Sequence, residues 1–78
     1  MSEENKRFME EYRLMNNMVD GLSLGDVSAN SERYLAVKIG LARMSSNYMR
    51  SPQCFVIGAL RERVRRLEDD NLMGRRAA

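Results

Sequence analysis

The sequence contains no histidine and only one cysteine, Cys54. Without histidine, the chain lacks the commonest metal ligand in proteins and the commonest general base at neutral pH. A single cysteine excludes an intrachain disulfide and any zinc site built from several cysteines. The stretch GLSLGD (21–26) lacks the preceding strand and the following lysine that a phosphate-binding loop requires. We therefore expect no enzyme activity, no metal or cofactor, and no small-molecule substrate.

Long apolar runs are missing as well. The longest, CFVIGAL (54–60), is far shorter than the roughly 20 residues that a membrane-spanning helix needs. The stretch MSEENKRFMEEY (1–12) is too charged for a signal peptide. A lone cysteine fits a reducing compartment. These features predict a cytoplasmic protein that does not contact membranes.

The chain has 78 residues, which is enough for a single domain (1–78) with a small core. A domain of this size buries only about 60% of the surface that its unfolded chain exposes. Such domains usually gain stability from a disulfide, a metal or another subunit. Because the composition excludes the first two, we expect a homodimer.

Strong helix formers dominate the composition, and β-branched residues nowhere alternate with polar ones over a useful length. The sequence therefore predicts an all-α fold. Its expected elements are three helices near 3–19, 31–50 and 52–73, a loop at 21–31, and a flexible basic tail at 74–78.

Local signals place the helix boundaries. The first helix should start just after Ser2, and either Asn30 or Ser31 is a suitable N-cap for the second. Pro52 suits the first position of the third helix, after a tight corner at Ser51. Gly21 and Gly74 are expected to end the first and third helices. Within the loop, the apolar residues either dock on the helices or form an extended arm, and we favour docking; they are Leu22, Leu24 and Val27.

The first two helices carry apolar stripes. In the first helix the stripe consists of Phe8, Tyr12, Met15 and Val19, and it packs either on the rest of this chain or in the groove of a partner. The second helix is apolar on two sides, with Leu35, Ile39 and Ala42 on the second side, which predicts a central position. Gly40 should permit another helix to approach closely.

The third helix carries a short heptad pattern in its apolar residues. Its a and d positions are Ile57, Leu60, Val64, Leu67 and Asn71. β-Branched residues at a, leucine at d and one asparagine at a favour a two-stranded coiled coil, in which the asparagine sets the register. We expect this seam to form the dimer; the alternative is that it completes the core of one chain. Phe55, Val56 and Ala59, beside the seam, are expected to pack against the other two helices, with Gly58 allowing close contact.

Basic residues concentrate toward the end of the chain, since residues 50–78 hold seven arginines and four acidic residues. Four of the arginines form a cluster: Arg61, Arg63, Arg65 and Arg66. They point in several directions and alternate with acidic residues, whereas a phosphate-binding face usually segregates its charge. We therefore expect contacts with an acidic partner first, and contacts with nucleic acid as the alternative.

We recognise no known family in the sequence, and its expected function follows from these surfaces. We predict a non-enzymatic interaction protein that binds and modulates another protein, as a regulator, an anti-factor or a co-chaperone does. The alternative is a small dimeric DNA- or RNA-binding regulator that uses the arginine cluster.

Overall fold

The computed structural model describes the backbone of residues 2–77 and the side chains of residues 2–72. Within this part of the chain there is no strand, and all regular structure is helical. The elements are α1 (Glu3–Asp20), a 3-10 helix η1 (Leu24–Asp26), α2 (Glu32–Asn47) and α3 (Cys54–Ala77). The prediction of an all-α fold with three α-helices is confirmed.

Serine side chains cap the starts of α1 and α2, and of the two residues considered for α2 the cap is Ser31. The hydroxyl of Ser2 accepts a hydrogen bond from the backbone N–H of Asn5 at 3.1 Å, and that of Ser31 accepts one from Tyr34 at 3.3 Å. Each satisfies a backbone donor that has no partner within its own helix. Gly21 caps the end of α1, as its position predicts.

The corner between α2 and α3 occupies more residues than expected. α2 ends at Asn47, not residue 50, and α3 begins at Cys54, not at Pro52. The carbonyl of Ser51 accepts from the N–H of Cys54 at 3.0 Å, and its hydroxyl accepts from the N–H of Gln53 at 3.3 Å. A residue before proline avoids helical geometry, so a series of turns separates the two helices.

The predicted end of α3 is wrong, because the helix continues through Gly74 to Ala77. No glycine in the described backbone has a positive φ, so Gly74 does not adopt the left-handed conformation that commonly ends a helix. The side chains of the predicted basic tail (74–78) lie outside the described residues.

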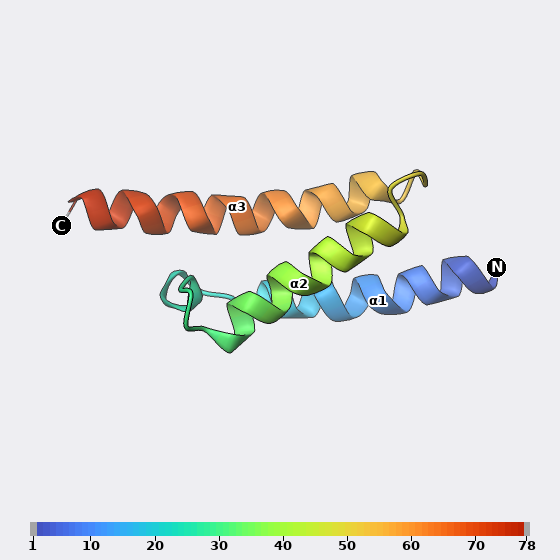
Figure 1. Cartoon of the computed structure of the whole chain (residues 1–78), viewed down its shortest axis with the longest axis horizontal. Coiled ribbons are helices and arrows are strands. Elements are labelled where there is room, and N and C mark those ends of the chain that lie inside the picture. Colours follow the sequence, from blue (N-terminus) through green and yellow to red (C-terminus); the bar gives the residue numbers. More distant parts are fainter. Residues whose placement is uncertain (1, 78) are drawn as a thin grey trace.

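The three helices form a single elongated body of 50 × 20 × 17 Å. Figure 1 shows α1 and α3 running in the same direction along its length, while α2 runs back obliquely and crosses α1. The C-terminal half of α3 extends beyond the end of α1 and passes beside η1.

Each α-helix contributes one stripe to a shared core. The buried residues are Phe8, Met15 and Val19 from α1, Leu22 from the loop, Val37, Leu41 and Met44 from α2, Tyr48 from the corner, and Ile57, Leu60 and Val64 from α3. Gly40 leaves room for a side chain of α1, since a Cβ there would be 2.6 Å from the Met15 sulfur. The predicted close approach at Gly40 is therefore confirmed.

α2 is not central, contrary to the sequence prediction. Its second apolar side faces outward, where Leu35 is 43% exposed and Ile39 is 53% exposed, and Ala42 is exposed as well. The reason is geometric: with only three helices, α1 and α3 both lie against one side of α2, and no described element covers the other.

The loop docks on the helices, as we favoured. Leu22 and Val27 are buried, while Leu24 is 47% exposed. The carboxylate of Asp26 accepts from the backbone N–H of Ser23 at 3.0 Å and from its hydroxyl at 3.1 Å, and these hydrogen bonds lower the pKa of Asp26. The side chain of Asn71 ties α3 to the loop by donating to the carbonyl of Leu24 at 3.0 Å.

Candidate protein-binding surface

The predicted dimer seam lies largely inside the single chain. Ile57 is fully buried, Leu60 and Val64 are 2% exposed, and Leu67 is half-buried against the same core. Asn71 faces the loop and donates to Leu24. The seam is therefore already covered by α1, α2 and η1, which is the alternative that the sequence left open. The dimer itself stays a prediction.

The predicted partner-binding face of α1 is also covered within the chain. Phe8, Met15 and Val19 are buried, and Tyr12 is half-buried. The ring of Phe8 packs edge-on against Tyr48, with centroids 5.0 Å apart, and stacks on Tyr12 at 6.0 Å. Of the two arrangements left open for α1, the structure has it packed on its own chain.

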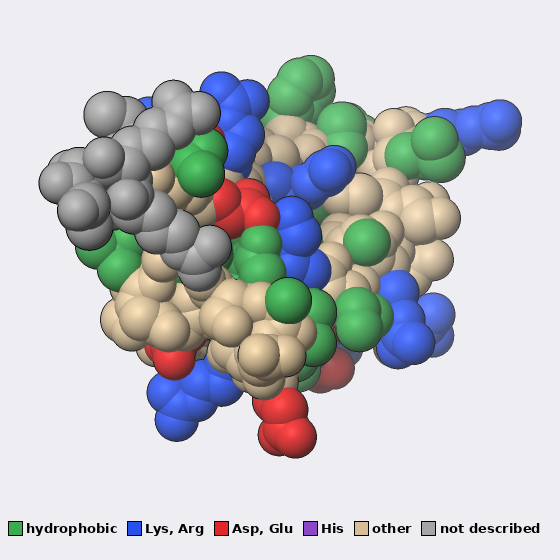
Figure 2. Space-filling view, turned by 60° about the vertical axis from the view of Figure 1, so that its left-hand side comes forward, with side chains coloured by type: hydrophobic (Ala, Val, Ile, Leu, Met, Phe, Trp, Pro, Cys, Tyr) green, Lys and Arg blue, Asp and Glu red, His purple; other side chains and the backbone are tan. Residues whose placement is uncertain are grey.

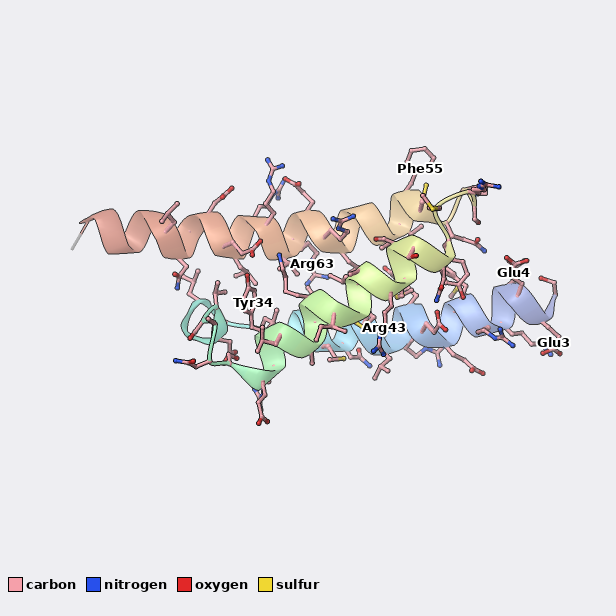
Figure 3. All side chains as sticks on the ribbon, viewed as in Figure 1. Glu3, Glu4, Tyr34, Arg43, Phe55 and Arg63 are labelled. Carbon is pink, nitrogen blue, oxygen red and sulfur yellow. The ribbon has the colours of Figure 1, made fainter. Side chains whose placement is uncertain are left out.

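The four clustered arginines do not form one surface. Arg63 turns toward α1, where it pairs with Asp20 and donates to the side-chain oxygen of Asn16 at 3.2 Å (Figure 3). Arg65 and Arg66 share Glu62 as their acidic neighbour, at 3.8 and 3.9 Å.

Arg61 is on the opposite side of α3 from Arg63, and the one hydrogen bond found for it is a long one to the hydroxyl of Ser45, at 3.4 Å. The described ion pairs include none to Arg61, so its charge is not neutralised by an acidic neighbour among them. The four guanidinium groups thus lie on at least two different sides of α3.

A groove opens between α2 and α3 on the Arg61 side. Its volume is about 430 Å³, and it is lined by Lys38, Leu41, Ala42, Gly58, Arg61, Glu62, Val64, Arg65 and Glu68. We call it the α2/α3 groove. Its lining combines apolar and small residues with three cationic and two acidic side chains. Figure 2 shows basic side chains beside hydrophobic ones on a face of the molecule.

Small residues keep the groove open. A Cβ at Gly58 would meet no other atom within 4 Å, so this glycine is not a point of close helix contact as predicted. Its neighbours Phe55, Val56 and Ala59 are also exposed, Phe55 by 80%, and the prediction that they pack against α1 and α2 is wrong. Phe55 points away from the helix bundle in Figure 3.

Glu68 is held at one end of the groove by two residues of α2. It accepts a hydrogen bond from the hydroxyl of Tyr34 and forms an ion pair with Lys38 at 3.1 Å. The hydrogen bond to Glu68, with burial, raises the pKa of Tyr34 to about 12. The same bond lowers the pKa of Glu68. Lys38 is paired with Glu68 and Arg65 with Glu62, so Arg61 is the cation of the groove that has no acidic partner among the described ion pairs.

Sequence reasoning named Arg61 and Arg65 but missed the α2 side of this groove. Lys38 and Ala42 stand four residues apart, as do Arg61 and Arg65, so each pair lies on one face of its helix. That spacing was visible in the sequence. Which faces meet depends on the crossing of α2 and α3, which the spacing does not specify.

The described residues include no group of three or more histidine, cysteine, aspartate or glutamate side chains placed to hold a metal ion. No described helix is long and apolar enough to cross a membrane. No family model, curated protein or solved structure matches this chain. Its function is therefore inferred from its own surfaces.

Proposed function

We propose that this protein is a small, non-enzymatic interaction protein, which binds and modulates another protein and forms a homodimer. The α2/α3 groove is its partner site. The ligand is an acidic amphipathic helix of the partner, with its apolar side chains against Ala42 and Gly58 and its carboxylates near Arg61 and Arg65.

The observation that supports this proposal most is the position of Arg61 beside an open groove in which the small residues Ala42 and Gly58 are exposed. Arg61 has no acidic neighbour among the described ion pairs, and the wall beside it is opened by Gly58. Helices of partner proteins commonly bind in such grooves through residues at i, i+3 and i+4. Arginine gives orientation, because its guanidinium forks onto a carboxylate.

The direct test uses a synthetic acidic helix with leucines on one face and glutamates on the other. Its affinity for the full chain is measured by fluorescence anisotropy near physiological salt. The variant Arg61→Glu with Arg65→Glu should weaken binding at least about tenfold, because two attractions become repulsions. Arg7→Glu with Arg13→Glu is the matched control: it makes the same change in net charge on α1, outside the groove.

A second variant blocks the groove without changing charge. Gly58→Leu should fill the space beside Arg61 while the fold is retained, because no described atom lies within 4 Å of a Cβ placed there. Equal affinity of the wild type and Gly58→Leu would contradict the groove as the site.

The same variants separate this proposal from nucleic-acid binding. If a DNA or RNA duplex binds instead, with an affinity that falls steeply as salt rises, and both arginine reversals on α3 abolish it, the alternative function is correct. Binding through apolar burial should respond to salt much less.

A further inference from the structure

The proposed homodimer needs an interface other than the α3 seam, because that seam is already buried within one chain. The outward side of α2 offers another. Its central residue, Ile39, is 53% exposed and its neighbour Leu35 is 43% exposed. These residues stand on the opposite side of α2 from the buried Val37, Leu41 and Met44. No described element of the chain covers them.

Four exposed residues form one line along this side of α2. They are Glu32, Ala36, Ile39 and Arg43, which follow one another at i, i+4, i+7 and i+11. This is the spacing of the a and d positions of a coiled coil, here read on the outer face of α2. The line begins with an acid, ends with a base, and has apolar residues between them. We call it the α2 outer stripe.

The order of charges along the stripe makes it complementary to itself in one orientation only. If two copies pair antiparallel, Glu32 of each faces Arg43 of the other, and Ala36 of each faces Ile39 of the other. A parallel pair would place Glu32 beside Glu32 and Arg43 beside Arg43, which repel. Neither Glu32 nor Arg43 takes part in an ion pair among the described residues of one chain, so both charges are available to a second copy.

The apolar residues of the stripe fit the same orientation. Ala36 is small and Ile39 is large. Each central layer therefore pairs a small residue of one copy with a large residue of the other, which lets the helix axes approach closely. A dyad axis brings the same flank of both helices together. On the flank that carries Leu35 and Ala42, Leu35 of one copy then lies near Ala42 of the other.

We propose that a second copy of this chain docks antiparallel on the α2 outer stripe, with Glu32 against Arg43 at both ends and Ile39 against Ala36 at the centre. This inference rests on the self-association in the proposed function and names its surface. α2 has 16 residues and is about 24 Å long, so the contact lies at the small end of specific interfaces. The dimer should therefore be weak and form as concentration rises.

The test is sedimentation velocity of the full chain up to about 1 mM, where an association free energy of only about 4 kcal/mol already gives substantial dimer. Glu32→Arg alone and Arg43→Glu alone each place like charges in both end layers, and each should weaken association about tenfold. An equimolar mixture of these two variants should regain it, because each end layer of the mixed dimer then pairs one basic side chain with one acidic side chain. A loss of folding in one variant cannot produce that recovery.

Two controls complete the design. Arg13→Glu makes the same charge change as Arg43→Glu on an exposed part of α1 and should leave association unchanged. Ile39→Ser should weaken association without unfolding the chain, since it shortens an exposed side chain.

The outcomes are distinct. A wild type that is monomeric at about 1 mM overturns the dimer and its surface, since even a weak dimer is populated at that concentration. A dimer that persists in Ile39→Ser, or a mixture that does not recover, overturns the α2 outer stripe while leaving a dimer in place. None of these results bears on partner binding. That is measured separately, by comparing the affinity of the acidic helix for the wild type and for Arg61→Glu with Arg65→Glu.

Discussion

The side-chain amide of Asn71 donates a 3.0 Å hydrogen bond to the carbonyl of Leu24, which ties the late part of α3 to the loop that precedes α2. The heptad pattern had suggested that Asn71 sets the register of a dimer. In the structure it instead fastens the loop of its own chain. Leu24 needs such a tie, because its side chain is 47% exposed and contributes little burial.

Asn71→Leu should loosen the 21–31 loop. Loss of one hydrogen bond of this kind costs about 1 kcal/mol, and the cost should appear locally. Backbone amides of Asp26 and Val27, which bond to Ser23 and Leu24, should exchange faster with solvent, while those in the middle of α2 keep their rates. Unchanged exchange at these two amides, measured by NMR, would show that the tie does not order the loop.

Two glycines on facing helices should respond differently to alanine. At Gly58 a Cβ has open space, so Gly58→Ala should raise the free energy of unfolding by about 1 kcal/mol through helix propensity alone. At Gly40 a Cβ would lie 2.6 Å from the sulfur and 2.9 Å from the terminal carbon of Met15, which is buried. The flexible end of Met15 must then move within a packed core, so Gly40→Ala should raise the free energy of unfolding by less than Gly58→Ala does.

The double variant Gly40→Ala with Met15→Val tests the cause. Valine ends at its Cγ atoms and so lacks both atoms that the new methyl group would meet, which means that the two changes together should cost less than the sum of each alone. Urea unfolding of the wild type, the two single variants and the double variant gives the coupling energy. If the two single effects simply add, the strain lies somewhere other than Met15.

The Tyr34–Glu68 hydrogen bond gives stability that depends on pH at both extremes. The bond lowers the pKa of Glu68 below its ordinary value of 4.5, so its contribution is complete above that value and is lost as pH falls through the folded-state pKa. It raises the pKa of Tyr34 to about 12 from 10.0, so its contribution is complete below 10.0 and is lost as pH rises through about 12.

Tyr34→Phe removes the bond and should lower the free energy of unfolding by about 1 kcal/mol between roughly pH 5 and roughly pH 10. The difference from the wild type should shrink as the pH falls below 4.5 and Glu68 becomes protonated. Urea unfolding across this range measures it. A difference that stays constant down to about pH 2 would mean that Glu68 does not carry the effect.

Phe55 and Ile57 stand two residues apart on α3. Replacing each by alanine should change the free energy of unfolding by very different amounts. Ile57 is fully buried, so Ile57→Ala should cost about 3 kcal/mol through lost burial and a cavity. Phe55 is 80% exposed, and Phe55→Ala should change stability by less than about 0.5 kcal/mol. Thermal unfolding by circular dichroism distinguishes them. A large cost at Phe55 would indicate that it packs against the bundle after all.

Local features of the sequence determined the helices and most of the core. Ser2, Ser31 and Gly21 cap the helices at or next to the predicted boundaries, because a cap is set by a residue bonding to backbone a few positions away. The stripe that the spacing marked on the first helix is mostly buried, as Phe8 and Met15 show. Helical periodicity fixes which residues share a face, since that relation lies within a turn or two of the chain.

Only the tertiary structure decided what each face meets. An apolar stripe has the same spacing whether another helix of the chain or a second chain covers it, so Leu60 and Val64 could not be assigned to the core or to a dimer from spacing alone. The packing of α2 against α1 and α3 buried Leu41 and left Ile39 exposed, and the crossing of α2 and α3 brought Lys38 to the groove beside Arg61. These outcomes depend on how three helices share one small core, because there is too little apolar surface in the chain to cover every stripe.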